Sequence, residues 1–181
     1  NQLTAARLVL SIVLFVLIPW KLYLAAMLVF LVAASTDWID GYWARKFGQV
    51  TTVGRIFDPF VDKIVICGAF IYLAALADSG IVPWMAVVIV AREMLVTALR
   101  NFLEGEGADF SAQFSGKLKM VFQCAAVAIS LYALTFAAEA IRPQWLQWAL
   151  TVSIWGTILL TVYSGVEYLR RAMLVIRVHM G

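Results

Sequence analysis

Four aspartates lie close together in a chain that is otherwise strongly apolar. They are four of the chain's six aspartates and fall within 26 residues: Asp37, Asp40, Asp58 and Asp62. Unpaired carboxylates at this density would repel one another, and carboxylate oxygens are the ligands that hard divalent cations such as Mg²⁺ and Mn²⁺ prefer. The segment therefore predicts a divalent-metal site. An ion-paired network between helices is the structural alternative, because charged groups inside membrane proteins also pair in that way.

The spacing of these aspartates is helical. Asp37 and Asp40 are three residues apart, and Asp58 and Asp62 are four apart, so each pair lies on one face of a helix. The connection between the two helices is short, which makes them antiparallel neighbours and allows all four carboxylates to face one another. The same helical stripes carry small residues, which leave room for a flat or phosphorylated ligand against the backbone: Gly41, Ala44 and Gly54.

The composition of the whole chain indicates the environment of these helices. Hydrophobic residues make up 64% of the 181 residues and charged residues 14%, and the mean hydropathy is +0.90. Soluble domains are about half apolar and about one quarter charged. We therefore expect an integral membrane protein with a single domain over residues 1–181, and we expect no nucleic-acid partner.

The apolar runs predict an all-α chain that spans the membrane six times. A spanning helix needs about 20 mostly apolar residues, and strands of a closed barrel, the other spanning structure, would alternate polar and apolar residues. The runs in this chain are continuous, with Leu, Ala, Val and Ile on every face. We place the six transmembrane helices at residues 4–20, 22–47, 54–77, 81–104, 114–138 and 143–172.

Basic residues indicate the orientation of these spans. With six spans, both termini and the connections at 47–54 and 104–114 lie on one face, and the half of the chain nearer that face carries 12 of the 14 Lys and Arg residues. Because cytoplasmic segments carry the excess of basic residues, we expect both termini and the aspartates to be cytoplasmic. Four tryptophans fall near the predicted outer ends, as an interfacial belt requires: Trp20, Trp84, Trp145 and Trp148.

The aspartate segment resembles the motif of a known family. "DWIDGYWAR", eight further residues and "GRIFDPFVD" fit the pattern D-x2-D-G-x2-A-R-x8-G-x3-D-x3-D at every position. This pattern resembles that of the CDP-alcohol phosphatidyltransferases. The resemblance implies a six-helix membrane fold with a site facing the cytoplasm. It also implies transfer of a phosphatidyl or related group from a CDP-linked donor to an alcohol, with release of CMP.

The resemblance also implies roles for individual residues. Asp37, Asp40 and Asp58 would hold one divalent metal, and Asp62 would serve as the catalytic base and share a second metal, so that two Mg²⁺ or Mn²⁺ ions are expected. Six further residues would bind the CDP group of the donor: Asn1, Thr4, Gly41, Ala44, Arg45 and Gly54.

Three other stretches resemble one branch of this family, the bacterial phosphatidylglycerophosphate synthases. They are the N-terminal segment with Asn1 and Thr4, "AREMLVTALR" at 91–100 and "SGKLKM" at 115–120, although Met120 stands where we expect Thr. The branch implies CDP-diacylglycerol as donor and sn-glycerol 3-phosphate, a dianion, as acceptor. Basic side chains suit that phosphate: Arg92, Arg100, Lys117 and Lys119. Anionic lipid at the inner leaflet is the alternative ligand for these residues.

Two other functions remain compatible with the pattern. One is the same chemistry with another acceptor, such as serine, inositol phosphate or phosphatidylglycerol; an acceptor with no phosphate would leave the basic residues without a role. A divalent-cation transporter would use the carboxylates as a permeation site. The expected location is the inner, cytoplasmic membrane as a multi-pass protein in contact with membrane lipids, and the resemblance is compatible with a homodimer.

Overall fold

The computed structural model describes residues 2–47, 52–105, 114–136 and 142–180. Within these ranges only the backbone is described at 2–4, 37–47, 52–59, 62, 104–105, 114–115, 117 and 175–180. The described residues form six α-helices and one 3₁₀ turn and contain no strand, so the all-α prediction is confirmed. The elements are α1 Gln2–Leu17, α2 Tyr23–Phe47, α3 Thr52–Ala74, η1 Ala77–Ser79, α4 Pro83–Gly105, α5 Phe114–Thr135 and α6 Gln144–Met180.

The predicted helix boundaries agree with the structure to within a few residues except at the C-terminus. The last helix was predicted to end at residue 172, whereas α6 continues to Met180. The prediction followed the apolar run, which the charged pair Arg170 and Arg171 interrupts. Helical structure needs no apolar residues, and the segment after this pair contains neither Gly nor Pro before residue 181, so nothing in it ends the helix.

The connection between α3 and α4 is a compact turn in which glycine is required. Gly80 has φ 77°, and an added Cβ there would lie 3.0 Å from Leu150 Cδ2 and 3.1 Å from Ile154 Cδ1 of α6. Glycine adopts this left-handed conformation without steric strain. α4 then begins with Pro83, whose missing N–H is harmless in the first turn of a helix.

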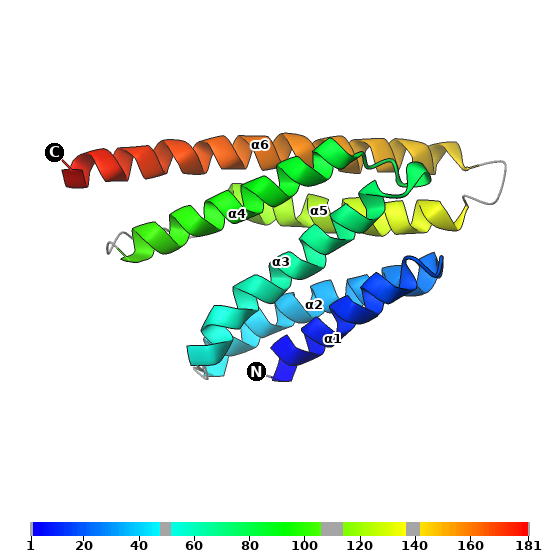
Figure 1. Ribbon diagram of the computed structural model, residues 1–181, viewed down its shortest axis with the longest axis horizontal. Coiled ribbons are helices and arrows are strands. Elements are labelled where there is room, and N and C mark those ends of the chain that lie inside the picture. The colour runs from blue at the N-terminus through cyan, green and yellow to red at the C-terminus, as the bar shows by residue number, and fades with distance from the viewer. Residues whose placement is uncertain (1, 48–51, 106–113, 137–141, 181) are drawn as a thin grey trace.

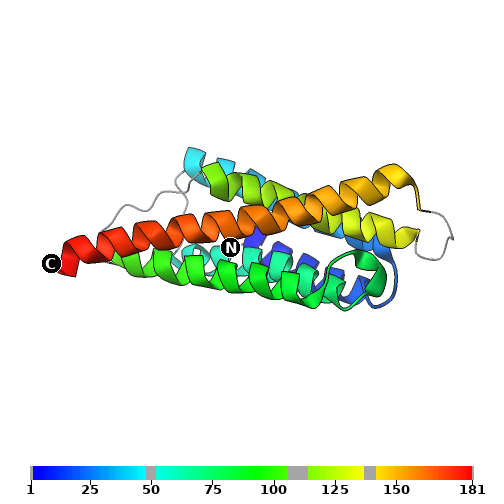
Figure 2. The same ribbon diagram turned by 90° about the horizontal axis from the view of Figure 1, so that it is seen from above.

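Helix α3 lies between two groups of helices, and α5 also connects the groups, because it packs against α6, α2 and α3. Figure 1 shows α1 and α2 on one side, α4, α5 and α6 on the other, and α3 crossing obliquely between the two groups. α6 packs against both α4 and α5; in Figure 2 α4 runs along one side of α6, and α5 crosses it. Within the described residues no Cα atom of α4 comes within 8 Å of a Cα atom of α5, although α3 packs against both helices. The gap between α4 and α5 is therefore bridged by side chains and by neighbouring helices.

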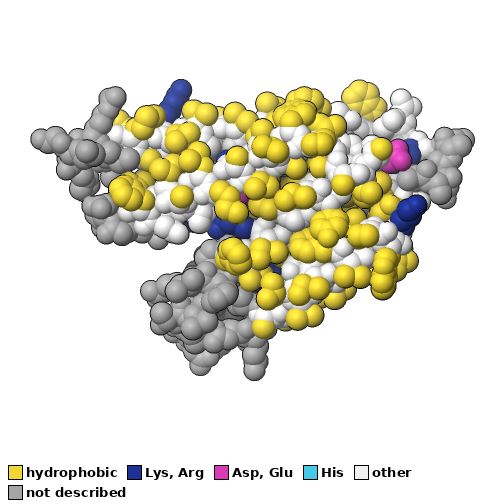
Figure 3. Space-filling model, viewed as in Figure 1, with side chains coloured by type: hydrophobic (Ala, Val, Ile, Leu, Met, Phe, Trp, Pro, Cys, Tyr) yellow, Lys and Arg dark blue, Asp and Glu magenta, His cyan; other side chains and the backbone are white. Residues whose placement is uncertain are grey.

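The surface of the described part is apolar, as a lipid-facing surface requires. Figure 3 shows one face on which most side chains are hydrophobic and the Lys and Arg side chains are confined to a few small groups. Among the residues with described side chains, two helical segments are long and apolar enough to cross a membrane, Leu118–Thr135 of α5 and Gln144–Leu174 of α6. The four tryptophans expected at the outer ends are all exposed, and they lie in the turn after α1 and near the starts of α4 and α6: Trp20, Trp84, Trp145 and Trp148.

Two glycines allow aromatic rings to lie directly on a neighbouring helix backbone. An added Cβ at Gly68 of α3 would lie 2.2 Å from Phe15 Cζ of α1, and one at Gly156 of α6 would lie 2.5 Å from Phe122 Cε1 of α5. Helices in membranes associate largely through such close packing at small residues, because lipid provides no hydrophobic driving force between them. These contacts fix α1 against α3 and α5 against α6.

Candidate active site

The backbone brings the four predicted metal ligands to one end of two consecutive helices. Asp37 and Asp40 lie in the last three turns of α2, and Asp58 and Asp62 lie in the first three turns of α3. Figure 1 shows α2 and α3 running in opposite directions. The donor set, carboxylates at helical spacing on two antiparallel helices, fits hard divalent cations. The side chains of these aspartates lie outside the described residues, so their metal-binding and catalytic roles stay predictions.

The residues predicted to bind CDP also belong to this end of the molecule. Thr4 is in the first turn of α1, while the others fall in the same helical turns as the aspartates: Gly41, Ala44 and Arg45 in α2 and Gly54 in α3. Their side chains, like Asn1 as a whole, lie outside the described part of the chain. Their contact with a nucleotide stays a prediction.

Two of the four predicted phosphate-binding residues, Arg92 and Lys119, contact one carboxylate, that of Glu93 of α4. The Nη1 atom of Arg92 lies 3.4 Å from Glu93 Oε1, and Lys119 of α5 forms an ion pair with the same oxygen. Gln123, one turn after Lys119, donates from Nε2 to Glu93 Oε1 at 3.3 Å. The Arg92, Glu93 and Lys119 side chains are 9%, 12% and 7% exposed, so all three are largely buried.

Helix α6 holds the two arginines from the other side. Arg92 Nη2 donates to Ser164 Oγ at 3.0 Å, and Arg100 Nη2 donates to Tyr168 Oη at 3.0 Å. The ring of Tyr168 lies against both guanidinium groups, with its centroid 5.7 Å from Arg92 Cζ and 5.9 Å from Arg100 Cζ. Glycine at position 165 leaves room for the Arg92 side chain, because a Cβ added at Gly165 would lie 3.3 Å from Arg92 Cγ.

We refer to Arg92, Glu93, Arg100, Lys119 and Tyr168 as the basic cluster. Its three cations and one anion give a net charge of +2. Lys117 has its backbone in the first turn of α5, but its side chain is outside the described residues. The structure therefore brings Arg92, Arg100 and Lys119 together and leaves the position of the Lys117 side chain as a prediction.

Helix α3 connects the basic cluster with the aspartates. The Cys67 side chain lies within range of the charges of Glu93, Lys119 and Lys63. Cys67 follows Asp62 by five residues, which corresponds to about 7.5 Å along a helix axis. The basic cluster thus lies beside α3 shortly after the predicted catalytic base.

Several residues of the basic cluster and its surroundings were not predicted from the sequence. Glu93 and Gln123 could have been found, because an ionisable residue inside an apolar run is a candidate functional group, and Gln123 shares a helical stripe with Lys119. Ser164 and Tyr168 carry no such local signal. They lie 72 and 68 residues from the arginines that they contact, so only the fold brings them together.

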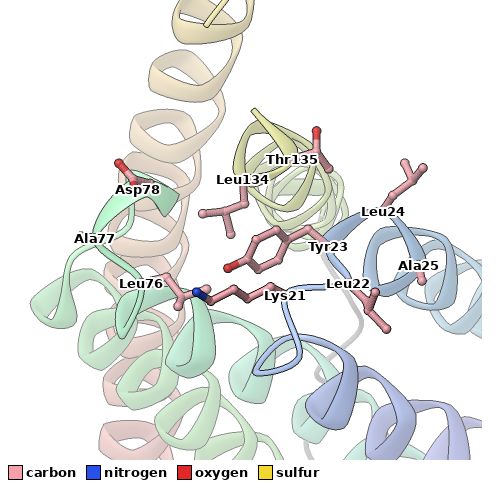
Figure 4. A pocket seen from close by; sticks show the side chains of 10 residues that line it. All are labelled: Lys21, Leu22, Tyr23, Leu24, Ala25, Leu76, Ala77, Asp78, Leu134 and Thr135. Atoms are coloured by element: carbon pink, nitrogen blue, oxygen red, sulfur yellow. The ribbon is translucent and has the colours of Figure 1, made fainter. Parts of the chain in front are cut away.

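A separate cavity lies at the other end of the molecule. It has a volume of about 860 Å³ and opens between the start of α2, the turn after α3 with η1, and the end of α5. Figure 4 shows the side chains of Lys21 and Tyr23 extending into it toward Leu76. Asp78 is the single carboxylate in its lining. Since α2 and α3 carry the predicted metal ligands at their opposite ends, this cavity does not belong to the candidate active site.

The comparison with known proteins agrees with the motif. A sequence model of the CDP-alcohol phosphatidyltransferase family matches residues 1–163, which include the four aspartates and most of the basic cluster. The chain is similar to the CDP-diacylglycerol–glycerol-3-phosphate 3-phosphatidyltransferase of Bacillus subtilis strain 168, with 37% identity over 148 residues, 81% of this chain and 72% of the relative.

Relatives from two further bacteria carry the same name. The Escherichia coli K12 protein is 32% identical over 158 residues, which cover 86% of this chain and 81% of the relative. The Shigella flexneri serotype 5b protein is 31% identical over the same length and coverage. Both the family match and these identities extend over most of the chain. The chain therefore belongs to the CDP-alcohol phosphatidyltransferase family.

Proposed function

We propose that this protein transfers the phosphatidyl group of CDP-diacylglycerol to sn-glycerol 3-phosphate, giving phosphatidylglycerophosphate and CMP. The relatives above carry the name of this activity. The choice of acceptor rests on the basic cluster. In this cluster Arg92, Arg100 and Lys119, together with the one anion Glu93, give a net charge of +2. An acceptor without phosphate would leave these buried cations without a ligand, whereas a phosphate dianion neutralises them.

The arginines also have donors left for such a ligand. Within the described part of the chain, the Nε atoms of Arg92 and Arg100 are buried and have no hydrogen-bond partner. Buried donors are nearly always satisfied in native proteins, so a donor without a partner indicates a missing ligand or water. Guanidinium groups bind phosphate oxygens through two parallel N–H groups, which gives this site directional as well as electrostatic specificity.

The aspartates would carry out the chemistry at the other end of the acceptor. Asp37, Asp40, Asp58 and Asp62 would hold two Mg²⁺ or Mn²⁺ ions, which neutralise a diphosphate and stabilise the leaving phosphate when bound. Asp62 would take the proton from the acceptor's free terminal hydroxyl. The hydroxyl oxygen then bonds to the phosphorus that carries diacylglycerol, the bond from that phosphorus to CMP breaks, and CMP leaves with the electron pair.

The residues that would bind the donor lie in the same helical turns. Small residues, Gly41, Ala44 and Gly54, would allow the cytidine to lie against the backbone, and Arg45 would bind the diphosphate. Asn1 and Thr4 would complete this pocket from α1. Because the donor carries two acyl chains, the exposed apolar surface of the helices suits its lipid half.

The proposed location is the inner membrane, with six spans and the site facing the cytoplasm. α5 and α6 are long and apolar enough to span by themselves. In α1, α2 and α3 the residues with described side chains include apolar segments at Ala5–Leu17, Tyr23–Thr36 and Lys63–Ala74, each of which begins or ends where the described side chains do. The concentration of 12 of 14 basic residues toward one face supports cytoplasmic termini.

The direct test is CMP release by the purified protein. CDP-diacylglycerol and Mg²⁺ are supplied with one acceptor at a time: glycerol 3-phosphate, serine, inositol phosphate or phosphatidylglycerol. We expect release with glycerol 3-phosphate and background release with the others. Release with serine alone would refute the proposed acceptor. Absence of release with every acceptor, together with Mn²⁺ flux into proteoliposomes, would instead support the cation transporter.

A further inference from the structure

Glu93 is a buried anion to which the proposed reaction assigns no role. Its Oε1 atom alone receives three donors, Arg92 Nη1 at 3.4 Å, Gln123 Nε2 at 3.3 Å and the ammonium group of Lys119. A carboxylate with this many donors is a weak base. It is therefore poorly suited to take a proton from a substrate, and its function must be sought in the groups that it binds.

The position of Glu93 between two helices indicates what it does. It lies on α4, whereas Lys119 and Gln123 lie one turn apart on α5. The backbones of α4 and α5 do not approach within 8 Å of each other in the described residues, so side chains must span the gap. One carboxylate oxygen of α4 thus contacts two side chains, Lys119 and Gln123, that lie one turn apart on α5. It places the Lys119 ammonium beside the Arg92 guanidinium, although the two cations repel each other.

We propose that Glu93 is a positioning residue for the acceptor phosphate: it holds Lys119 of α5 next to Arg92 of α4, so that both cations meet one phosphate group. The inference rests on the proposed function, because it concerns how that acceptor is bound. Glu93 itself does not touch the substrate. It acts through Lys119, with Gln123 fixing the orientation of the carboxylate.

The Glu93→Gln variant separates this role from a purely electrostatic one, because the two predict changes of opposite sign. Loss of the negative charge raises the net charge of the basic cluster from +2 to +3. If Glu93 only lowered the local potential, the variant would bind the dianion more tightly and the KM for glycerol 3-phosphate would fall. If Glu93 positions Lys119, that KM rises, because the amide oxygen holds an ammonium group more weakly than a carboxylate does.

The experiment measures CMP release by the purified full chain, with kcat and a separate KM for each substrate, and the unfolding temperature in detergent. We expect Glu93→Gln to raise the KM for glycerol 3-phosphate by about tenfold, the effect of losing one charged hydrogen bond. The KM for CDP-diacylglycerol should change by less than about twofold. Glu167→Gln is the matched control, since Glu167 is a partly exposed carboxylate that pairs with Arg171 on the same helix at 3.4 Å.

A double-mutant cycle with Lys119→Gln tests whether Glu93 acts through the lysine. If it does, Glu93→Gln should change the KM for glycerol 3-phosphate by less than about twofold in the Lys119→Gln background. Multiplicative effects of the two substitutions would overturn the proposal. Glu93→Asp keeps the charge but shortens the side chain by one methylene, and we expect an intermediate KM. It also provides the test if Glu93→Gln does not fold.

The remaining outcomes distinguish this inference from the proposed function. An unchanged or lowered KM for glycerol 3-phosphate in Glu93→Gln, with an active wild type, would overturn the inference and leave the proposed function intact. A lower unfolding temperature with unchanged KM values would also overturn it, because it would show a purely structural link between α4 and α5. A wild type that releases no CMP with glycerol 3-phosphate would refute the proposed function and this inference with it.

Discussion

Ser164 of α6 allows a test of whether the C-terminal helix holds Arg92 in position for the acceptor. Its hydroxyl accepts a hydrogen bond from Arg92 Nη2 at 3.0 Å and donates to the carbonyl of Thr161 at 3.2 Å. Ser153, three turns earlier on the same helix, donates to the carbonyl of Leu150 at 3.0 Å. The two serines are 0% and 5% exposed. Ser164→Ala and Ser153→Ala are therefore closely matched, and they differ chiefly in the contact with Arg92.

The magnitude of the effect follows from this one hydrogen bond. A hydrogen bond to a charged group contributes about 1.5–3 kcal/mol. Arg92 keeps its contacts with Glu93 and Tyr168 in the variant, so we take the lower value, about 1.5 kcal/mol, which corresponds to about a tenfold change. The guanidinium group then occupies the phosphate-binding orientation for less of the time. We expect Ser164→Ala to raise the KM for glycerol 3-phosphate about tenfold.

The assay is the release of CMP at varied glycerol 3-phosphate and saturating CDP-diacylglycerol, with unfolding temperatures of both variants in the same detergent. Ser153→Ala should leave the KM within about twofold of the wild type. Because both variants lose one hydroxyl-to-carbonyl bond within a helix turn, any shared change in unfolding temperature reports that loss. Equal KM values in the two variants would refute the reasoning, since Ser164 would then have no influence on how Arg92 binds the acceptor.

Three further predictions concern the chemistry and the fold. Asp62→Asn should lower kcat by about 10²–10⁴-fold, which is the usual contribution of a general base. The KM for glycerol 3-phosphate should stay nearly unchanged. Normal turnover would exclude Asp62 as the base. Chelation with EDTA should abolish CMP release, and added Mg²⁺ or Mn²⁺ should restore it; activity that persists without divalent ions would contradict the metal-site prediction. Gly68→Ala should lower the unfolding temperature, because the new Cβ would lie 2.2 Å from Phe15 Cζ. Overpacking of this kind costs about 1–3 kcal/mol of stability. Gly116→Ala is the control and should not lower the unfolding temperature, because its Cβ meets no heavy atom within 4 Å.

The helices were predictable because the apolar runs that form them are long and their interruptions are local. Residues such as Lys21 and Gly80 have positive φ angles, and both lie in the connections that the sequence marks with polar or turn-forming residues. The end of α6 was not predictable in this way. The apolar pattern reports which residues face lipid or core, and it stops where the helix carries Arg170 and Arg171, although the backbone hydrogen bonds continue.

The candidate site was predictable only where its residues are close in sequence. The aspartates occupy one motif, so helical spacing alone groups them on two adjacent helices. The basic residues could be named, but the carboxylate that pairs with two of them could not, since Lys119 and Glu93 are 26 residues apart on helices whose Cα atoms, where described, stay more than 8 Å apart. Tyr168 was missed for the same reason. It also lies beyond residues 1–163, which the family model matches.

The arrangement of charges around Glu93 explains why a lipid-embedded protein tolerates three cations in a largely buried position. Burial of a charge is costly unless it is paired, and here one carboxylate pairs with two of the cations while a tyrosine ring lies against the two arginines. Among the side chains that the structure describes in this cluster, this leaves a net charge of +2. A second buried carboxylate would neutralise the cluster further, but it would also compete with an incoming phosphate for the same donors. A dianionic acceptor supplies the missing two negative charges only while it is bound, so the free protein retains the electrostatic attraction that the acceptor needs.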